Sequence, residues 1–267
     1  MRLRPIAGLL LRQLYLLRGS PTRILPLFAW VAIDVVLWGF IARYLQRVGP
    51  ASIDFSAQLV GAVLFWDFFV RVKQGVIMSF FEDVWSRNFI NVFATPLTVG
   101  EYLAGLVLTS IGTGAVGLGA MLLLAGTLFS LPWFGLGVAV LPALLVMFTF
   151  GAALGVVASA LVLRYGPTAE WLVWPLPALL APFAGVFYPL ATLPNWMQTV
   201  ARALPPSYVF EAMRAVLTGG TPSWSALALA AAIAVAEVGA ACWVFTRVYR
   251  YAVRKGLLAR YSAESVT

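Results

Sequence analysis

Histidine is missing from the 267-residue sequence, cysteine occurs once, at Cys242, and charged residues make up only 10% of the chain. Metal centres built on His or Cys, haem ligation and internal disulfides therefore have almost no residues to draw on. A membrane-embedded transferase or hydrolase would need a His or a cluster of acids near one face. The acidic residues are scattered along the sequence, so we expect no catalytic, cofactor or metal site in this chain.

Hydrophobic residues fill the sequence instead. They make up 62% of it and the mean hydropathy is +0.92, whereas an ordinary soluble domain is about one quarter charged. Several apolar runs reach the roughly 20 residues that cross the hydrocarbon core of a bilayer. We therefore expect an all-α membrane protein with six spans, forming a single transmembrane domain over residues 1–267. The expected spans are 24–45, 55–80, 102–129, 134–163, 171–190 and 224–249.

The net charge of +8 comes from Lys and Arg residues near the span ends. This placement indicates control of topology and contact with anionic lipid rather than binding to nucleic acid. If the N-terminus is inside, the outer flanks hold only Arg43, Arg47, Arg202 and Arg214. The positive-inside rule then places both termini in the cytoplasm.

If residues 1–22 form a helix, one face of that helix is apolar and the opposite face is basic. The apolar stripe contains Leu3, Ile6, Leu10, Leu14 and Leu17, and the basic side contains Arg4, Arg12 and Arg18. This pattern predicts an amphipathic helix in the membrane interface. A disordered basic start is the alternative interpretation.

The segment 82–97 lies between two apolar runs, yet it is too polar to cross a bilayer and too apolar for a free loop. One edge of the expected helix is apolar, with Val84, Phe89 and Phe93, and another edge carries Asp83, Arg87 and Asn91. A short amphipathic helix of this kind lies on lipid or docks into a groove on a soluble partner. Composition does not choose between the two.

Two charged residues interrupt the second expected span. Asp67 and Arg71 are spaced i, i+4, so they suit an ion pair on one helix face. They line a substrate path or stabilise the cytoplasmic mouth.

The fourth expected span contains regularly spaced small residues. Gly151, Gly155 and Ser159 repeat a small residue every fourth position. This repeat permits close helix packing within one subunit or at a dimer seam.

The stretch 190–221 is too short and too rich in proline for two spans. Proline breaks at Leu193–Pro194 and Leu204–Pro206 flank one short helix, which predicts a re-entrant helical hairpin in the outer leaflet. Glu211 and Arg214 are spaced i, i+3 near the outer mouth. They form part of a gate, or the hairpin is a simple lid before the last span.

Two stretches carry a resemblance to a known family. FFEDVWSRNFINVFATPLTVGEYLAG, from Phe80, and APFAGVFYPLATLPNWMQTVARALPPSYVFEAMRAVLTGG, from Ala181 to Gly220, resemble the cytoplasmic loop and the outer signature of ABC-2 type exporter permeases. The resemblance covers nearly the whole chain. It implies the membrane subunit of an ATP-driven exporter in a bacterial inner (plasma) membrane, which moves a lipid-linked glycan, glycolipid or hydrophobic compound outward.

The resemblance also implies site residues. The segment 82–97 corresponds to the coupling helix that docks on the ATPase, with Glu82, Asp83, Trp85, Arg87, Phe89 and Asn91 as its contact residues. Candidates for the substrate path or gate are Asp67, Arg71, Tyr188, Trp196, Glu211 and Arg214.

An ATP-driven exporter needs a P-loop, in which a lysine follows a glycine. The lysines here are Lys73, after Val72, and Lys255, after Arg254, so the chain has no Walker A motif. The resemblance therefore implies a separate ABC ATPase subunit, which binds the ATP and Mg, and a second permease copy, as a homodimer or with a paralogue. A secondary transporter or channel not driven by ATP is the alternative, although the sequence contains no visible internal repeat.

Overall fold

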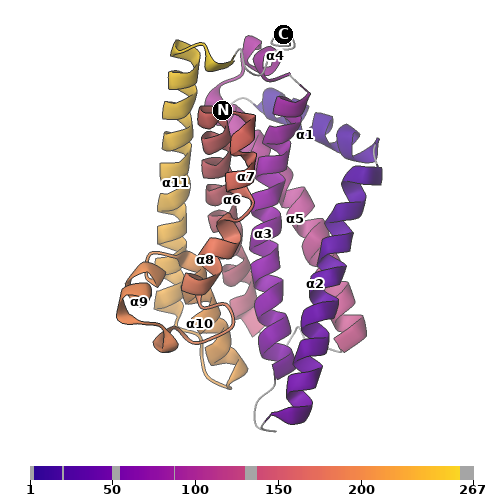
Figure 1. The fold of residues 1–267 in the computed structure, drawn as a ribbon, viewed down its shortest axis with the longest axis vertical. Coiled ribbons are helices and arrows are strands. Elements are labelled where there is room, and N and C mark those ends of the chain that lie inside the picture. Colours follow the sequence, from indigo (N-terminus) through magenta and orange to yellow (C-terminus); the bar gives the residue numbers. More distant parts are fainter. Residues whose placement is uncertain (1–2, 20, 50–54, 87, 130–136, 259–267) are drawn as a thin grey trace.

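The computed structural model describes residues 3–19, 21–49, 55–86, 88–129 and 137–258, which form helices and connecting turns without any strand. Long helices run side by side along the long axis of the molecule, and the short helices α7 and α8 lie part-way along it (Figure 1). The long helices are α2 (Pro21–Val48), α3 (Phe55–Trp85), α5 (Val99–Phe129), α6 (Val140–Tyr165) and α11 (Trp224–Arg254). The short ones are α1 (Leu3–Arg18), α4 (Phe89–Ala94), α7 (Glu170–Val173), α8 (Leu176–Ala184), α9 (Asn195–Ala201) and α10 (Pro205–Leu217).

Figure 1 shows α1, α4 and the last turns of α11 at one end of the bundle, whereas α9 and α10 lie toward the other end. We call the first the docking end, after the predicted role of residues 82–97, and the second the hairpin end. Helix α1 begins and ends inside the predicted 1–22 stretch, and it packs across the bundle against α5 and α2.

Within the described residues, four helical stretches are long and apolar enough to cross a membrane, fewer than the six spans that the sequence predicted. They are Phe28–Val48, Val99–Phe129, Gly137–Tyr165 and Trp224–Arg254. Helix α3 is as long as α5, but Asp67, Arg71 and Lys73 interrupt its apolar run. These charged groups are buried against neighbouring helices, so α3 still belongs to the interior of the bundle.

The predicted span over 171–190 is wrong as a continuous helix. Helix α7 ends at Val173, a turn covers Trp174 and Pro175, and α8 ends at Gly185 in the left-handed conformation. Proline has no backbone N–H, so Pro175 and Pro177 each remove a hydrogen bond from the helical ladder. The apolar composition of this stretch hid a break that its prolines indicate.

The small residues of α6 pack within this chain, as one of the two interpretations predicted. A Cβ atom on Gly155 would lie 2.6 Å from Val76 Cβ, and one on Gly151 would lie 2.8 Å from the Phe69 carbonyl oxygen. Helix α6 therefore approaches the backbone of α3 closely at these positions. On α5, a Cβ atom on Gly112 or Gly119 would meet nothing within 4 Å.

Candidate functional sites

The predicted coupling segment 82–97 is not one helix in the structure. Glu82 and Asp83 belong to the last turns of α3, which ends at Trp85, and α4 begins at Phe89. The backbone N–H of Asn88 donates to the Asp83 carbonyl oxygen at 3.0 Å, which closes the turn between the two helices. The segment therefore forms a tight corner at the docking end.

Asp83 points into the protein rather than toward a partner, and its side chain is only 2% exposed. The Tyr102 hydroxyl donates to Asp83 Oδ2 at 2.7 Å, and the Arg12 guanidinium forms an ion pair with Oδ1. Helices α1, α3 and α5 meet at this carboxylate. Asp83, predicted to contact a docked partner, therefore has its charge neutralised inside the chain in this structure.

The apolar edge of the segment also faces inward. Phe89 is fully buried, and its ring lies edge-on to Phe80 at 5.7 Å between centroids and to Tyr102 at 6.2 Å. Among the predicted contact residues, Trp85 is 49% exposed and Asn91 is also exposed. Glu82 is half-buried, and Arg87 lies outside the described residues.

A groove of about 420 Å³ separates α1 from α4 at the docking end. Its walls include Pro5 and Leu9 from α1 and Asn91, Val92 and Pro96 from the segment that contains α4, and Arg12 also lines it. Nothing in the pattern of residues 1–22 indicates that α1 lies beside α4, so this groove is not predictable from the sequence.

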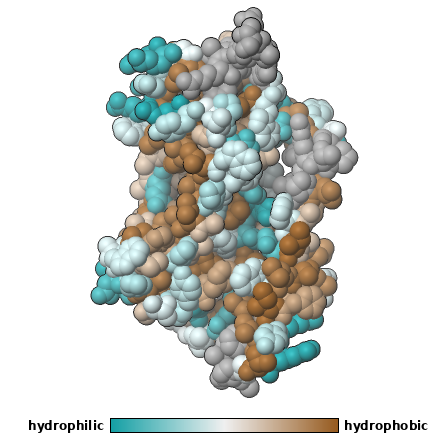
Figure 2. Space-filling model, viewed as in Figure 1, coloured by the Kyte–Doolittle hydropathy of each residue, from teal (hydrophilic) through white to brown (hydrophobic). Residues whose placement is uncertain are grey.

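Asp67 and Arg71 are both buried, but they do not form the predicted pair among the residues that the structure describes. Arg71 Nη1 donates to Gln74 Oε1 at 3.0 Å, and Nη2 lies 4.0 Å from Asp34 Oδ2 on α2. The guanidinium therefore turns along α3 and toward α2. The face that shows α2 and α3 carries a hydrophilic area at mid-height within hydrophobic surface (Figure 2).

Lys73 has a structural role that the sequence analysis did not foresee. Its ammonium is buried and donates to the Val173 carbonyl oxygen at 2.8 Å, with the Trp174 ring centroid at 5.5 Å. In a continuous helix this carbonyl would accept from the N–H of residue 177, which is a proline. Lys73 thus supplies the donor that Pro177 lacks and stabilises the break between α7 and α8.

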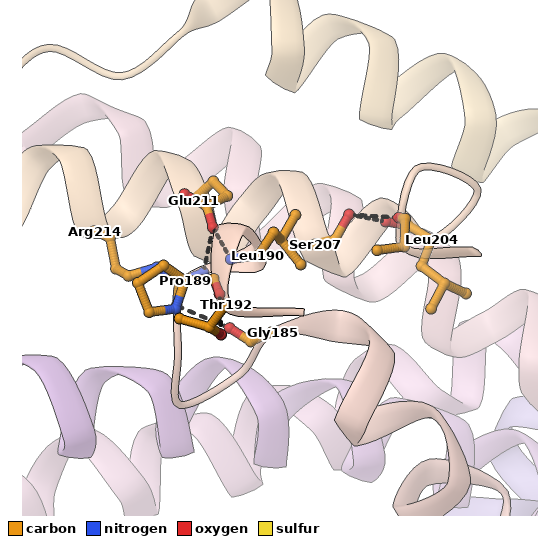
Figure 3. A network of polar contacts seen from close by, with 9 residues as sticks. Gly185, Pro189, Leu190, Thr192, Leu204, Ser207, Glu211 and Arg214 are labelled. Carbon is orange, nitrogen blue, oxygen red and sulfur yellow. Dashed lines mark hydrogen bonds and ion pairs between the residues drawn. The ribbon is translucent and has the colours of Figure 1, made fainter. Parts of the chain in front are cut away.

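At the hairpin end, Glu211 and Arg214 of α10 form the predicted ion pair (Figure 3). The pair also contacts the segment 185–190, which leads from α8 toward α9. Glu211 Oε1 accepts from Arg214 Nη2 at 2.9 Å and from the Leu190 N–H at 2.8 Å. Arg214 Nη1 donates to the Gly185 carbonyl oxygen at 2.8 Å, at the end of α8. The pair therefore joins α10 to both ends of the segment 185–190.

The two aromatic candidates at this end differ in their surroundings. The Tyr188 hydroxyl donates to the Pro182 carbonyl oxygen at 2.7 Å, which closes the turn after α8. Trp196 is 63% exposed and lies edge-on to Phe183, with 6.0 Å between ring centroids. Tyr188 therefore stabilises the turn, while Trp196 presents its ring on the outer surface.

Comparison with known proteins gives one family match. A family model described as ABC-2 type transporter matches residues 12–218, which contain the predicted coupling segment, Asp67, Arg71 and helices α9 and α10 of the hairpin. No curated protein matches the chain significantly.

Proposed function

This chain belongs to the ABC-2 type transporter family, and on that premise we propose that it is the membrane subunit of an exporter driven by a separate ABC ATPase. It carries an amphipathic substrate, such as a lipid-linked glycan, a glycolipid or a hydrophobic compound, from the cytoplasm or inner leaflet outward. The protein is located in the plasma (bacterial inner) membrane, with both termini in the cytoplasm.

The observation that carries the proposal is the construction of the docking end. The coupling segment, the start of α1 and the last turns of α11 lie there together (Figure 1). Asn91 is exposed and lines the α1–α4 groove, and Trp85 is exposed at the end of α3. An exposed tryptophan is the kind of anchor that protein interfaces use, so the ATPase docks here, with Glu82 at the edge of the contact.

The Asp83 ion pair suits the transmission of ATP-driven movement. Because Arg12, Asp83 and Tyr102 tie α1, α3 and α5 to one buried carboxylate, a push on the α3–α4 corner moves these helices together. A charged group buried in this way resists being pulled from its partners. The coupling element is therefore a rigid corner, whose buried residues transmit force and whose exposed residues bind the partner.

A second permease copy completes the assembly. The break between α7 and α8 exposes Trp171 and Trp174 together with non-helical backbone at Pro175. Within a membrane, such backbone is tolerated only where protein or water covers it. A homodimer that buries this face is the simplest arrangement, and a paralogous second permease is the alternative.

The hairpin is the outer gate in this proposal. Glu211 and Arg214 link α10 to the segment 185–190, so movement of α10 shifts the turn after α8 as well. Substrate leaves beside these charges. The simpler possibility, in which the hairpin only shortens the connection to α11, predicts no effect of Glu211 on export.

A secondary transporter is the second candidate, because Asp34, Asp67 and Glu237 lie within membrane helices, and such groups couple ion movement to transport elsewhere. The experiment that separates the two uses the full chain purified from its native membrane with its bound proteins. We expect a polypeptide with a Walker A motif in the complex, and substrate movement in proteoliposomes that requires ATP. Transport that runs on an ion gradient without ATP would support the second candidate instead.

A further inference from the structure

Two carboxyl groups meet near the middle of the bundle, on adjacent helices. Asp34 lies in the central part of α2 and Asp67 in that of α3. The two carboxyl groups lie close enough to interact, and Arg71, one turn after Asp67, has its Nη2 4.0 Å from Asp34 Oδ2. Asp67 is 8% exposed. We call Asp34 and Asp67 the carboxyl pair.

The surrounding protein neutralises only part of this pair. Arg71 is the nearby cation, and it divides its donors between Gln74 and Asp34. Asp67 Oδ2 is buried and has no hydrogen-bond partner among the described residues. Two carboxylates side by side in a medium of low dielectric constant do not both stay ionised unless a further positive charge joins them. The pair therefore has room for one more cation or proton.

The side chains of α2 around the carboxyl pair suit an organic cation. The Asp34 side chain is 34% exposed, so the pair opens toward the surface of α2. Trp30 and Trp38 lie one helical turn before and after Asp34, and aromatic rings attract organic cations. On the same helix, Ile33, Leu37 and Phe40 line an apolar surface groove of about 600 Å³, which suits a hydrocarbon chain.

We propose that the carboxyl pair binds the ammonium group of an amphipathic amine, with Asp67 as the principal acceptor and the groove on α2 holding the apolar part. The inference rests on the proposed function in that it takes this amine to be the transported molecule or to resemble it. The recognised chemistry is a positive head on an apolar body, and either a transported compound or the amine headgroup of a lipid can supply it.

The test measures binding to the purified full chain in maltoside micelles, without ATPase or ATP. The probe is monodansylcadaverine, a fluorescent amphipathic amine, and its N-acetylated form is the neutral control of the same shape. Because no transport is measured, failure of the site is distinguishable from failure of the exporter proposal. We expect the wild type to bind the amine at least about tenfold more tightly than the acetylated form, since contacts with charged groups are strong when buried.

Asp67→Asn should remove this preference, and Asp34→Asn should weaken it. Glu237→Gln is the matched control, because Glu237 is also an acid of a membrane helix, and its buried Oε2 has no hydrogen-bond partner within the part of the chain that the structure describes; it should leave the preference intact. Competition by added phosphatidylethanolamine would identify a lipid headgroup as the source, and no competition would favour a transported compound. Equal binding of both probes to the wild type, as a site for a proton alone requires, would overturn the proposal. Equal weakening of both probes in folded Asp67→Asn protein would also overturn it.

Discussion

The hydrogen bond from Tyr102 to Asp83 is the contact whose removal tests the docking end most sharply. Tyr102→Phe deletes the hydroxyl and keeps the ring, which is fully buried and packs near Phe89, Phe93 and Phe245. The donor and acceptor are 2.7 Å apart. A buried hydrogen bond to a charged group contributes about 1.5–3 kcal/mol, so the free energy of unfolding should fall by about this amount.

The assay is denaturant unfolding of the full chain in mixed micelles, followed by tryptophan fluorescence. Tyr15→Phe is the matched control, because Tyr15 is 71% exposed, and it should change stability by less than about 0.5 kcal/mol. A double-mutant cycle with Asp83→Asn isolates the pair and should give a coupling energy of about 1 kcal/mol or more. A loss in Tyr102→Phe no larger than that in Tyr15→Phe, or zero coupling, would refute the buried arrangement of Asp83.

Three further predictions concern the break, the gate and the topology. Lys73→Met should lower stability by about 1–3 kcal/mol, because it leaves the Val173 carbonyl without a donor; the exposed Lys255→Met is the control, and equal effects would remove the role of Lys73 in the break. Glu211→Ala should lower export while the ATPase stays bound, because the Leu190 N–H loses its acceptor; unchanged export at normal expression would leave the hairpin as a simple lid. In a cysteine-free background, a cysteine at Thr199 should react with an impermeant maleimide in whole spheroplasts, and labelling only in inverted vesicles would reverse the proposed orientation.

The long apolar helices follow directly from composition. Helices α5, α6 and α11 lie close to the predicted spans because a run of apolar residues longer than the hydrocarbon core has few other conformations available in a membrane. The break in 171–190 was missed because hydropathy does not register backbone donors. Pro175 and Pro177 carry no charge that would mark the end of a span, but each lacks the backbone N–H that a continuous helix needs.

The direction in which side chains point was the part that the sequence did not reveal. Periodicity placed Asp83 and Phe89 on different edges of one helix, but the chain bends at Asn88 and both residues turn inward. The reason lies far away in the sequence, because Arg12 and Tyr102 supply the partners of Asp83. Local pattern also suggested an ion pair between Asp67 and Arg71, and α2 altered that arrangement by bringing Asp34 to the guanidinium.

Site-specific photocrosslinking tests the central claim, that the docking end binds an ABC ATPase. A benzoylphenylalanine placed at Trp85, which is exposed at the end of α3, or at Asn91, which lines the α1–α4 groove, should form an adduct with a polypeptide that carries a Walker A motif. The same group at Trp196, which is 63% exposed on α9, should form none. The account is contradicted if the ATPase co-purifies but crosslinks at neither docking position, or if it crosslinks at Trp196.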